Sequence, residues 1–561
     1  MTSPPILDQL LTFESDIMSV PTYTTKRLDH LGLVAGFCQE INLASIIDNA
    51  LDSSERKHVS YGQLFIAMIL NGLGFTGRTM HMYSEFFDDK PISRLIGEGI
   101  EAKHLNDDAL GRCLDSLYDF GVSELYQHIA EKVVTHLKLP CQFTHLDSTS
   151  FHYDGKANAD DDNPNELHIT KGYSRDHRPE LNQVVLNLIC ENQSGIPVYM
   201  QAANGNTNDM QGFKKIVKSH IGSLKAAQQC RYLVADSALY VKDTIVELTD
   251  QSQLFITRVP QKITESKRLI EMAKSMKKGG NTLTFEPISE GYEGAWHDSD
   301  YGGIKQKWLL VRSQQATKRE RHALNKRMLK LANQSRTTFK RLCQQKFACA
   351  DDAQAAIELW QAKQPTLAVT NTCVHEVPVF KGAGRPKKGQ QPSNIYYQIS
   401  GQLYTPIASR EEALGELGLF ILATNDTSGS LSMNEMLTTY KSQQAVEKGF
   451  RFLKSPDFLT SAFYIKKPER IEALLMVMTT CLMVYASLEH TIRKELKEQA
   501  EYFPDMKKKP TQRPTARWVF QCFAGIDLLT IDKQENMLLN IKHRQTIIIK
   551  ILGPIYQKIY S

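Results

Sequence analysis

Disulfide and zinc motifs are absent from this 561-residue sequence, although it contains ten cysteines. The cysteines are scattered from Cys38 to Cys522, and none forms a CxxC pair or lies beside histidines at zinc-finger spacing. Neither a disulfide framework nor a zinc finger is therefore expected, and a reducing compartment is the simplest environment. We also find no internal repeat.

We also expect no membrane-spanning segment. The most apolar stretch, Ala473 to Leu488, is interrupted by Thr479 and Thr480 and is shorter than the ~20 residues that a membrane-spanning helix needs. We expect a buried helix there. The first residues, MTSPPILDQLL, lack the basic start and continuous apolar run of a signal peptide, so a cytoplasmic location is expected.

The overall composition has no strong bias. Apolar residues make up 42% of the chain and charged residues 23%, so global disorder is not expected. The net charge of +5 and the pI near 8.5 permit nucleic-acid binding without requiring it. Because a chain of this length exceeds a single typical core, roughly three or four structural units are expected.

The order of helical and strand patterns predicts a mixed α/β protein. An initial helical domain is followed, from Pro140, by apolar strand patterns that then alternate with helical ones. The strand pattern stops near residue 260 and resumes near residue 418, which indicates a sheet interrupted by a large insertion. The chain ends in a helical region. The predicted parts are residues 1–138, 139–260, 261–417, 418–495 and 496–561.

Acidic residues are scarce in part of the insertion. The region from Lys305 to Lys346, which includes a predicted helix from Thr317 to Gln345, has about a dozen Lys and Arg residues and only Glu320 as an acid. It is either a solvated basic helix or a surface that contacts phosphate groups. A second basic stretch, Lys507 to Arg513, lies among prolines, and we interpret it as an exposed linker.

A short basic motif in the insertion has two interpretations. Gly384-Arg385-Pro386, followed by Lys387, resembles the core of an AT-hook, an extended segment that lies in a narrow minor groove. An ordinary exposed turn has the same composition, since Gly and Pro beside Lys favour turns.

Two aspartates end apolar strand patterns. Asp147 closes the segment QFTHLD, and Asp236 closes the segment RYLVAD. A carboxylate directly after a strand of an open sheet lies at the crevice where such folds hold ligands, although Asp is also typical of turns. Asp209 precedes a helical pattern from Met210 to His220, and we interpret it as the N-cap of that helix rather than as a catalytic acid.

A third carboxylate lies in the segment YKSQQAVEKGFRFLK. If this segment is one helix, five polar side chains fall within an arc of roughly 80° and the opposite face is apolar. The five are Tyr440, Gln443, Glu447, Arg451 and Lys454. An amphipathic helix with a solvated face is the simple interpretation. Together with the two aspartates, however, Glu447 predicts a site for two Mg²⁺ or Mn²⁺ ions, with cations beside it for phosphate.

The aspartate motifs resemble those of the DDE transposases of bacterial insertion sequences. Asp147-Ser148-Thr149 resembles the first acid motif of that family, and the segment Asp236 to Tyr240 resembles the second. The stretch from Gly172 to Pro179 is similar to a loop between the first strands of the family.

The third motif resembles the group of this family that carries a YREK signature and a large insertion before the third acid. Tyr440, Glu447 and Lys454 stand at the spacing of that signature. Gln443 occupies its arginine position, and Arg451 on the same face is the alternative cation.

This resemblance implies an RNase H-like catalytic core in which Asp147, Asp236 and Glu447 bind the metal ions. Water would nick the transposon end, and the freed 3′ hydroxyl would then attack target DNA. Tyr440 and Lys454 would hold the DNA phosphate near the metals.

The partners implied are the double-stranded DNA of the terminal repeats and of the target, bound by a homodimer at the bacterial nucleoid. The N-terminal helical domain is a candidate for binding the DNA ends. Two alternatives stay open: a catalytically inactive DNA-binding protein derived from a transposase, and an RNase H-like nuclease that cuts without joining.

Overall fold

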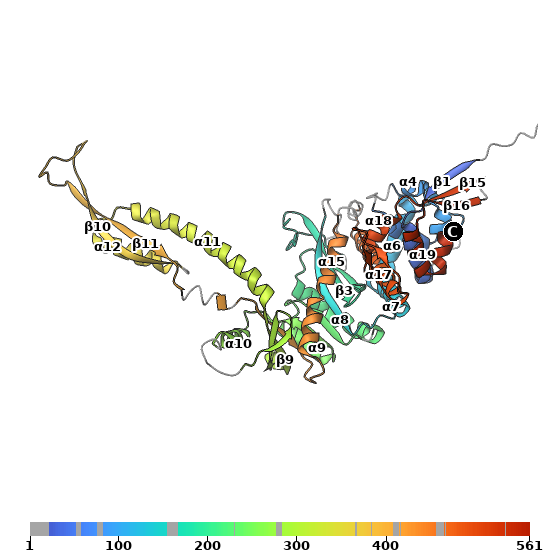
Figure 1. Cartoon of the computed structure of the whole chain (residues 1–561), viewed down its shortest axis with the longest axis horizontal. Helices are drawn as coiled ribbons and strands as arrows, with labels where there is room; N and C mark the ends of the chain where they lie inside the picture. Colours follow the sequence, from blue (N-terminus) through green and yellow to red (C-terminus); the bar gives the residue numbers. More distant parts are fainter. Residues whose placement is uncertain are drawn as a thin grey trace, which may run out of the picture. The chain divides into compact units, whose positions relative to one another are not determined.

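The computed structural model divides the chain into two units. Unit 1 contains residues 1–238 and 441–561, and unit 2 contains residues 239–440 (Figure 1). The structure describes residues 22–51, 58–75, 82–153, 167–228, 230–275, 283–364, 367–382, 384–407, 414–415, 417–455, 465, 467–532 and 535–561. The predicted boundaries of the five parts remain predictions.

Unit 1 contains a mixed β-sheet. Its strands lie in the order β4-β3-β2-β5, with β2 antiparallel to β3 and parallel to β5, and β3 antiparallel to β4. Their bounds are β2 Phe143–Tyr153, β3 Asn182–Glu191, β4 Pro197–Ala203 and β5 Tyr232–Ala235. Helix α8 (Asp209–Gln228) connects β4 to β5, which gives the α/β order that the sequence predicts.

Strand β2 is longer than the sequence suggests. The sequence predicts that a strand ends at Asp147, but one unbroken strand continues past it because β3 pairs along it from Thr144 to Tyr153. The neighbour on the other side, β5, pairs only as far as Leu146. The prediction that Asp147 ends its strand is therefore wrong: the parallel neighbour ends there, while β2 continues.

The N-terminal part of unit 1 is helical, as predicted. Its helices are α1 (Leu31–Glu40), α2 (Leu43–Ala50), α3 (Tyr61–Leu73), α4 (Tyr83–Asp88), α5 (Ile92–Leu95), α6 (Asp107–Phe120) and α7 (Val122–Leu137), with a 3₁₀ turn at Ala102–His104. The N-terminus of α3 is stabilised by a capping box, in which the Ser60 hydroxyl accepts from the Gln63 N–H and the Gln63 side chain accepts from the Ser60 N–H.

Helix α17 (Pro468–Glu498) is the long apolar helix of unit 1. It contacts α1, α3, α6 and α7, and Figure 1 shows α6 and α7 beside it. Its length and composition would suffice to cross a membrane, with a mean hydropathy of 1.8 over its most apolar window, but 83% of that window is buried within the protein. The burial predicted for Ala473 to Leu488 is therefore confirmed.

The C-terminal region is helical but also contributes short strands. Its elements are β13 (Phe503–Pro504), β14 (Pro510–Thr511), α18 (Ala516–Phe523), β15 (Asp527–Ile531), β16 (Glu535–Leu539), α19 (His543–Leu552) and α20 (Pro554–Ile559). Strand β1 (Tyr23–Arg27) pairs antiparallel with β15, which joins the two ends of the chain in one small sheet. The close approach of α1 to α20 requires glycine, because a Cβ on Gly36 would lie 2.6 Å from the Tyr556 ring.

Unit 2 contains five strands in the order β6-β12-β9-β8-β7, all antiparallel to the neighbours for which pairing is recorded. Their bounds are β6 Leu254–Arg258, β7 Glu286–Ser289, β8 Tyr292–Ser299, β9 Gln306–Ser313 and β12 Leu419–Thr424. Helices α9 (Lys242–Asp250), α10 (Thr264–Ser275) and α14 (Met433–Lys441) and a 3₁₀ turn at Tyr301–Gly303 accompany them. Strand β6 thus pairs with β12, which follows the predicted insertion, and three strands of the insertion extend the same sheet.

The rest of the insertion is built around the basic helix α11 (Gln314–Gln344). Only Ser335 and Phe339 of this helix are buried. Helix α12 (Ala350–Ala362) and the hairpin of β10 (Ala368–Val379) and β11 (Asn394–Tyr404) follow, and their small apolar core contains Phe347, Ala353, Ile357 and Ile399.

Candidate active site

The register of β2 and β5 sets Asp147 and Asp236 side by side. The last paired residues of these parallel strands are Leu146 and Ala235, and each aspartate is the next residue of its chain. Neighbouring strands lie about 4.8 Å apart, so the two aspartates are adjacent residues on neighbouring strands. Asp147 is 9% exposed and Asp236 is half-buried.

The pKa values of both carboxyls are raised. Burial raises the pKa of Asp147 to about 6, and the charge of Asp236 adds to this effect, while the Ser148 N–H and Arg175 oppose it. Burial also raises the pKa of Asp236, helped by the charge of Asp209 and opposed by the Ala238 N–H, which donates to Asp236 Oδ1 at 2.9 Å. The pair therefore holds negative charge that the fold only partly compensates.

Arg175 is the positively charged residue that contacts the carboxylates of this site. One guanidinium nitrogen lies 3.5 Å from Asp147 Oδ1, and another lies 2.6 Å from both Asp209 Oδ2 and the Ser148 hydroxyl oxygen. The guanidinium also donates to the Ser148 carbonyl. The Ser148 hydroxyl in turn donates to Asp209 Oδ1 at 2.5 Å. The guanidinium thus lies among carboxylates that could also bind a metal cation.

Asp209 does not cap α8, contrary to the prediction. It is the first residue of the helix, and the N-cap bond is made by the residue before it, since Asn208 Oδ1 accepts from the Gln211 N–H at 2.9 Å. The carboxylate of Asp209 is therefore available to Ser148 and Arg175. Sequence reasoning missed this role because an Asp at a helix start satisfies the capping pattern equally well.

The loop from Gly172 to Pro179 also connects β2 to the segment that carries Glu447. Asp176 Oδ2 accepts from Lys454 Nζ at 2.7 Å and lies 3.2 Å from His152 Nε2. Lys454 Nζ also lies 5.8 Å from the centre of the Phe151 ring. These contacts join the end of α15 (Gln444–Leu453) to β2. The charged residues of this loop were the available sequence signal, but their partners lie too far away in the chain to be identified from spacing.

The segment from Tyr440 to Lys454 is not one helix, contrary to the prediction. Helix α14 ends at Lys441, and α15 begins at Gln444. At the break, the Ser442 hydroxyl donates to Asn192 Oδ1 and lies 3.2 Å from His145 Nε2. These contacts attach the break between the two helices to β2 and to the residue that follows β3.

Helix α15 runs along β2, with Ser442 beside His145 at one end and Lys454 beside Phe151 at the other. Glu447 is five residues beyond Ser442, about 7.5 Å along a helix. Asp147 is two residues beyond His145, about 7 Å along a strand. Glu447 and Asp147 therefore lie at the same level of the two elements.

The structure does not bring Glu447 into contact with the aspartate pair. Its side chain is exposed. Within the described ranges, no three histidine, cysteine, aspartate or glutamate side chains are grouped closely enough to hold a metal ion. The structure thus brings the two aspartates together. The backbone of Glu447 lies level with Asp147, but the exposed Glu447 side chain does not complete a metal site with them.

The remaining predicted DNA-binding residues are spread over both units. Gln443 is half-buried and precedes α15 without a side-chain cap bond, and Arg451 is exposed on that helix. Tyr440 belongs to α14, before the break. Arg385 and Lys387 are exposed in the connection between β10 and β11. Nothing in this geometry tests their roles, which remain predictions.

Two family models match this chain. Residues 142–484 match the family model described as a transposase DDE domain, and residues 23–131 match a domain of unknown function (DUF4277). Among solved structures, the chain is similar to the piggyBac transposase in a cryo-EM structure of its synaptic complex with hairpin DNA. The identity is 10%, the TM-score is 0.37, and the match covers 90% of this chain and 82% of that one.

The comparison with curated proteins gave no match. The transposase model, however, matches more than half of the chain and spans both aspartates and α15. The chain therefore belongs to the family of proteins with a DDE transposase domain.

Proposed function

We propose that this protein is an active transposase, which cleaves DNA strands at transposon ends and joins the freed ends to target DNA. The observation that supports this best is the adjacency of the buried Asp147 and the half-buried Asp236 on parallel strands within the matched transposase domain. Two carboxylates are not buried side by side without cost, because each disfavours the ionised form of the other. Such an arrangement is typical of functional sites.

The aspartate pair fits a divalent metal ion. Mg²⁺ and Mn²⁺ prefer carboxylate oxygens, and Asp147 and Asp236 supply them. Arg175 contacts Asp147 in the metal-free protein and would compete with a bound ion for this carboxylate. We propose the two aspartates as ligands of two ions, with Glu447 as the third. When bound, the ions supply charge neutralisation at the phosphate and activation of the attacking oxygen.

The chain itself orients the groups around this site. The fold holds Asp147 in the middle of a strand that is paired on both sides up to Leu146, so its position is fixed by backbone hydrogen bonds. Lys454 supplies a cation at the end of α15, and a DNA phosphate can replace Asp176 as its partner. Gln443, Arg451 and Tyr440 are proposed as further DNA contacts near the scissile phosphate.

The raised pKa of Asp147 predicts a pH dependence of cleavage. Metal binding requires the ionised carboxylate, and Asp147 ionises only as the pH rises through about 6. We therefore expect activity to increase between about pH 5 and pH 7, which a series of cleavage rates across this range would measure.

The test is a strand-cleavage and joining assay on duplex DNA that carries the terminal repeats flanking the gene. The parent, Asp147→Asn and Asp236→Asn are compared in Mg²⁺, Mn²⁺ and EDTA, with the exposed Asp250→Asn as a matched control. Metal-dependent nicking and joined product in the parent and the control, lost in both site variants, is the expected result.

Three other outcomes separate the alternatives. Cutting without joined product would favour the nuclease, and binding without any cut would favour the inactive DNA-binding protein. Cleavage by both site variants at the parent rate would remove the aspartates from the site. The oligomeric state on DNA, measured by light scattering, tests the proposed homodimer.

A further inference from the structure

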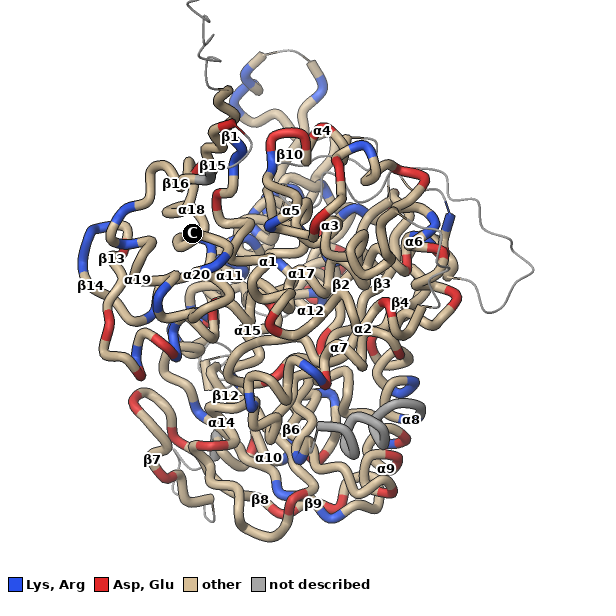
Figure 2. Tube along the Cα trace, turned by 90° about the vertical axis from the view of Figure 1, so that its right-hand side faces the viewer, with Lys and Arg blue, Asp and Glu red and all other residues tan. Residues whose placement is uncertain are grey.

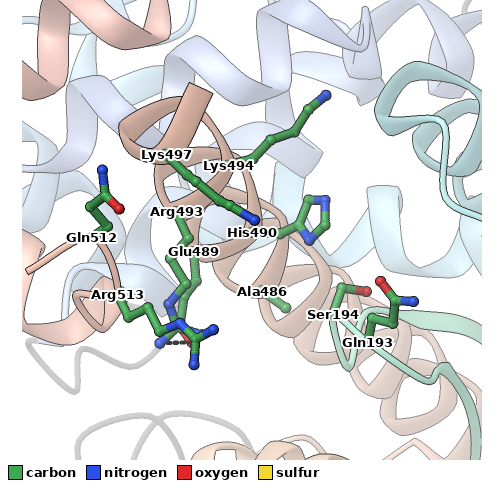
Figure 3. A pocket seen from close by; sticks show the side chains of 10 residues that line it. All are labelled: Gln193, Ser194, Ala486, Glu489, His490, Arg493, Lys494, Lys497, Gln512 and Arg513. Atoms are coloured by element: carbon green, nitrogen blue, oxygen red, sulfur yellow. Dashed lines mark ion pairs between the residues drawn. The ribbon is translucent and has the colours of Figure 1, made fainter. Parts of the chain in front are cut away.

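Unit 1 contains a cation-rich pocket on the surface formed by the end of α17. The hollow has a volume of about 420 Å³ and is lined by three segments, namely α17, the residues after β14, and the turn between β3 and β4 (Figure 3). The lining residues that matter here are Arg493, Lys494 and Lys497 from α17, Arg513 from the second segment, and Gln193 and Ser194 from the turn.

The positive charge of the pocket is only partly neutralised. Glu489, the acid in its lining, is engaged by Arg493 at 2.6 Å and by the Ala516 N–H at 2.8 Å. Lys494, Lys497 and Arg513 are exposed, and none has an acidic partner in the part of the chain that the structure describes. Three exposed cationic side chains, each a hydrogen-bond donor, therefore line one hollow.

The backbone around these cations is held in place by hydrogen bonds. Arg493 Nε donates to the Pro514 carbonyl at 2.9 Å, and Gln512 Nε2 donates to the carbonyls of Leu496 at 3.1 Å and Glu501 at 3.3 Å. The segment after β14 is thus fastened to α17. A surface preorganised in this way loses less conformational entropy when it binds an extended anion.

Gln512 and Arg513, at the end of the basic stretch from Lys507 to Arg513, line this pocket. The stretch is exposed, as predicted, but it belongs to a hairpin rather than to a linker. Strands β13 and β14 form a short hairpin, and Asp505 Oδ1 accepts from the N–H groups of Lys507 and Lys509. The turn is therefore fixed by a side chain within it. Figure 2 shows Lys and Arg residues gathered around β13 and β14.

The pocket is linked to the aspartate pair through the β3–β4 turn. Asn192, which precedes Gln193 in that turn, accepts from Ser442 and lies 2.7 Å from His145 Nε2. His145 is two residues before Asp147, about 7 Å along the strand. The turn that lines the pocket therefore contacts β2 close to the aspartates.

We propose that this pocket binds the phosphodiester backbone of duplex DNA next to the cleavage point, an inference that rests on the proposed function. Phosphate oxygens accept hydrogen bonds from Lys and Arg at any base sequence, so the pocket positions the duplex without reading it. The forked guanidinium of Arg513 can bind two phosphate oxygens, and Lys494 and Lys497 add point charges.

The test measures DNA binding in EDTA, where no cleavage occurs, with the full chain and a fluorescent duplex of arbitrary sequence. Lys497→Gln combined with Arg513→Gln is expected to weaken binding about tenfold and to reduce the slope of log affinity against log salt by about 2. The control is Lys267→Gln with Arg268→Gln, which removes the same charges from the exposed face of α10 and leaves both quantities unchanged.

Equal affinity and equal salt slope in the pocket variant and a DNA-binding parent would overturn the pocket proposal alone. A parent that binds no duplex would overturn it together with the proposed function. Lys497→Glu gives a second readout, since charge reversal is expected to weaken binding more than neutralisation. Circular dichroism and thermal unfolding show that each variant remains folded, as expected for exposed side chains.

Discussion

Strand β2 and helix α11 use charge in opposite ways. In β2, Asp147 is buried, its pKa is raised, and its carboxylate contacts the Ser148 N–H and Arg175, which in turn contacts Asp209. In α11, the cations are spread along an exposed helix, and the acid Glu320 is occupied by the Gly418 N–H at 2.7 Å. The first region is costly to fold and holds few charges, whereas the second is easily folded and holds many.

This difference indicates which charged side chains need a buried and fixed environment and which function while exposed to solvent. A reacting centre needs ligands at fixed positions, so its carboxylates are placed on paired strands despite the desolvation penalty. A phosphate backbone is a long and regular charged surface, so cations that bind it can remain solvated on a helix. The four predictions below test this contrast, from the largest expected effect to the smallest.

Glu447→Gln is expected to lower the cleavage rate by at least about 1,000-fold while DNA binding is kept, because a metal ligand is lost rather than a phosphate contact. The exposed Glu498→Gln is the matched control. Single-turnover cleavage in Mg²⁺ is the measurement. If Glu447→Gln cleaves normally and Asp209→Asn does not, the third acid is the one already hydrogen-bonded to Ser148.

Asp147→Asn is expected to stabilise the metal-free protein by about 1–3 kcal/mol near neutral pH, because a buried ionised carboxylate is removed. The parent carboxyl has a folded pKa of about 6, above its usual value, so its contribution to stability is present at low pH and is lost as the pH rises through 6. Urea unfolding in EDTA on both sides of this pKa measures the effect. A variant less stable than the parent at neutral pH would contradict it.

Removing two cations from α11, with Lys326→Gln and Lys330→Gln, is expected to weaken duplex binding about tenfold and to lower the salt slope by about 2. Both residues line an open hollow with Gln334 and Thr337. The double change Gln334→Ala with Thr337→Ala therefore controls for shape without changing charge. An unchanged salt slope would leave α11 as a solvated helix without contact to DNA.

Lys454→Gln is expected to lower the free energy of unfolding by only about 0.5–1 kcal/mol, because the pair with Asp176 is partly exposed. A double-mutant cycle with Asp176→Asn isolates the coupling between the two side chains. A coupling near zero would show that the crossing of α15 and β2 does not depend on this ion pair.

Much of the architecture was predictable from local patterns. Helical periodicity located the N-terminal helices and α17, and the return of a strand pattern near residue 418 indicated an interrupted sheet. The composition of α11 was sufficient to identify a basic helix. Errors arose where a residue type satisfies two structures equally: Asp147 as strand end or strand interior, Asp209 as cap or hydrogen-bond acceptor, and Lys507 to Arg513 as linker or hairpin.

The sequence by itself determined which residues carry the charge, which segments are helices or strands, and which family motifs the acids resemble. Only the tertiary structure decided that β5 ends beside Asp147, that Arg175 lies among the carboxylates, and that the helix is broken at Ser442 before Glu447. The physical reason is range. Helix and strand preferences act over a few residues, whereas strand register and ion pairing depend on partners tens to hundreds of residues away in the chain.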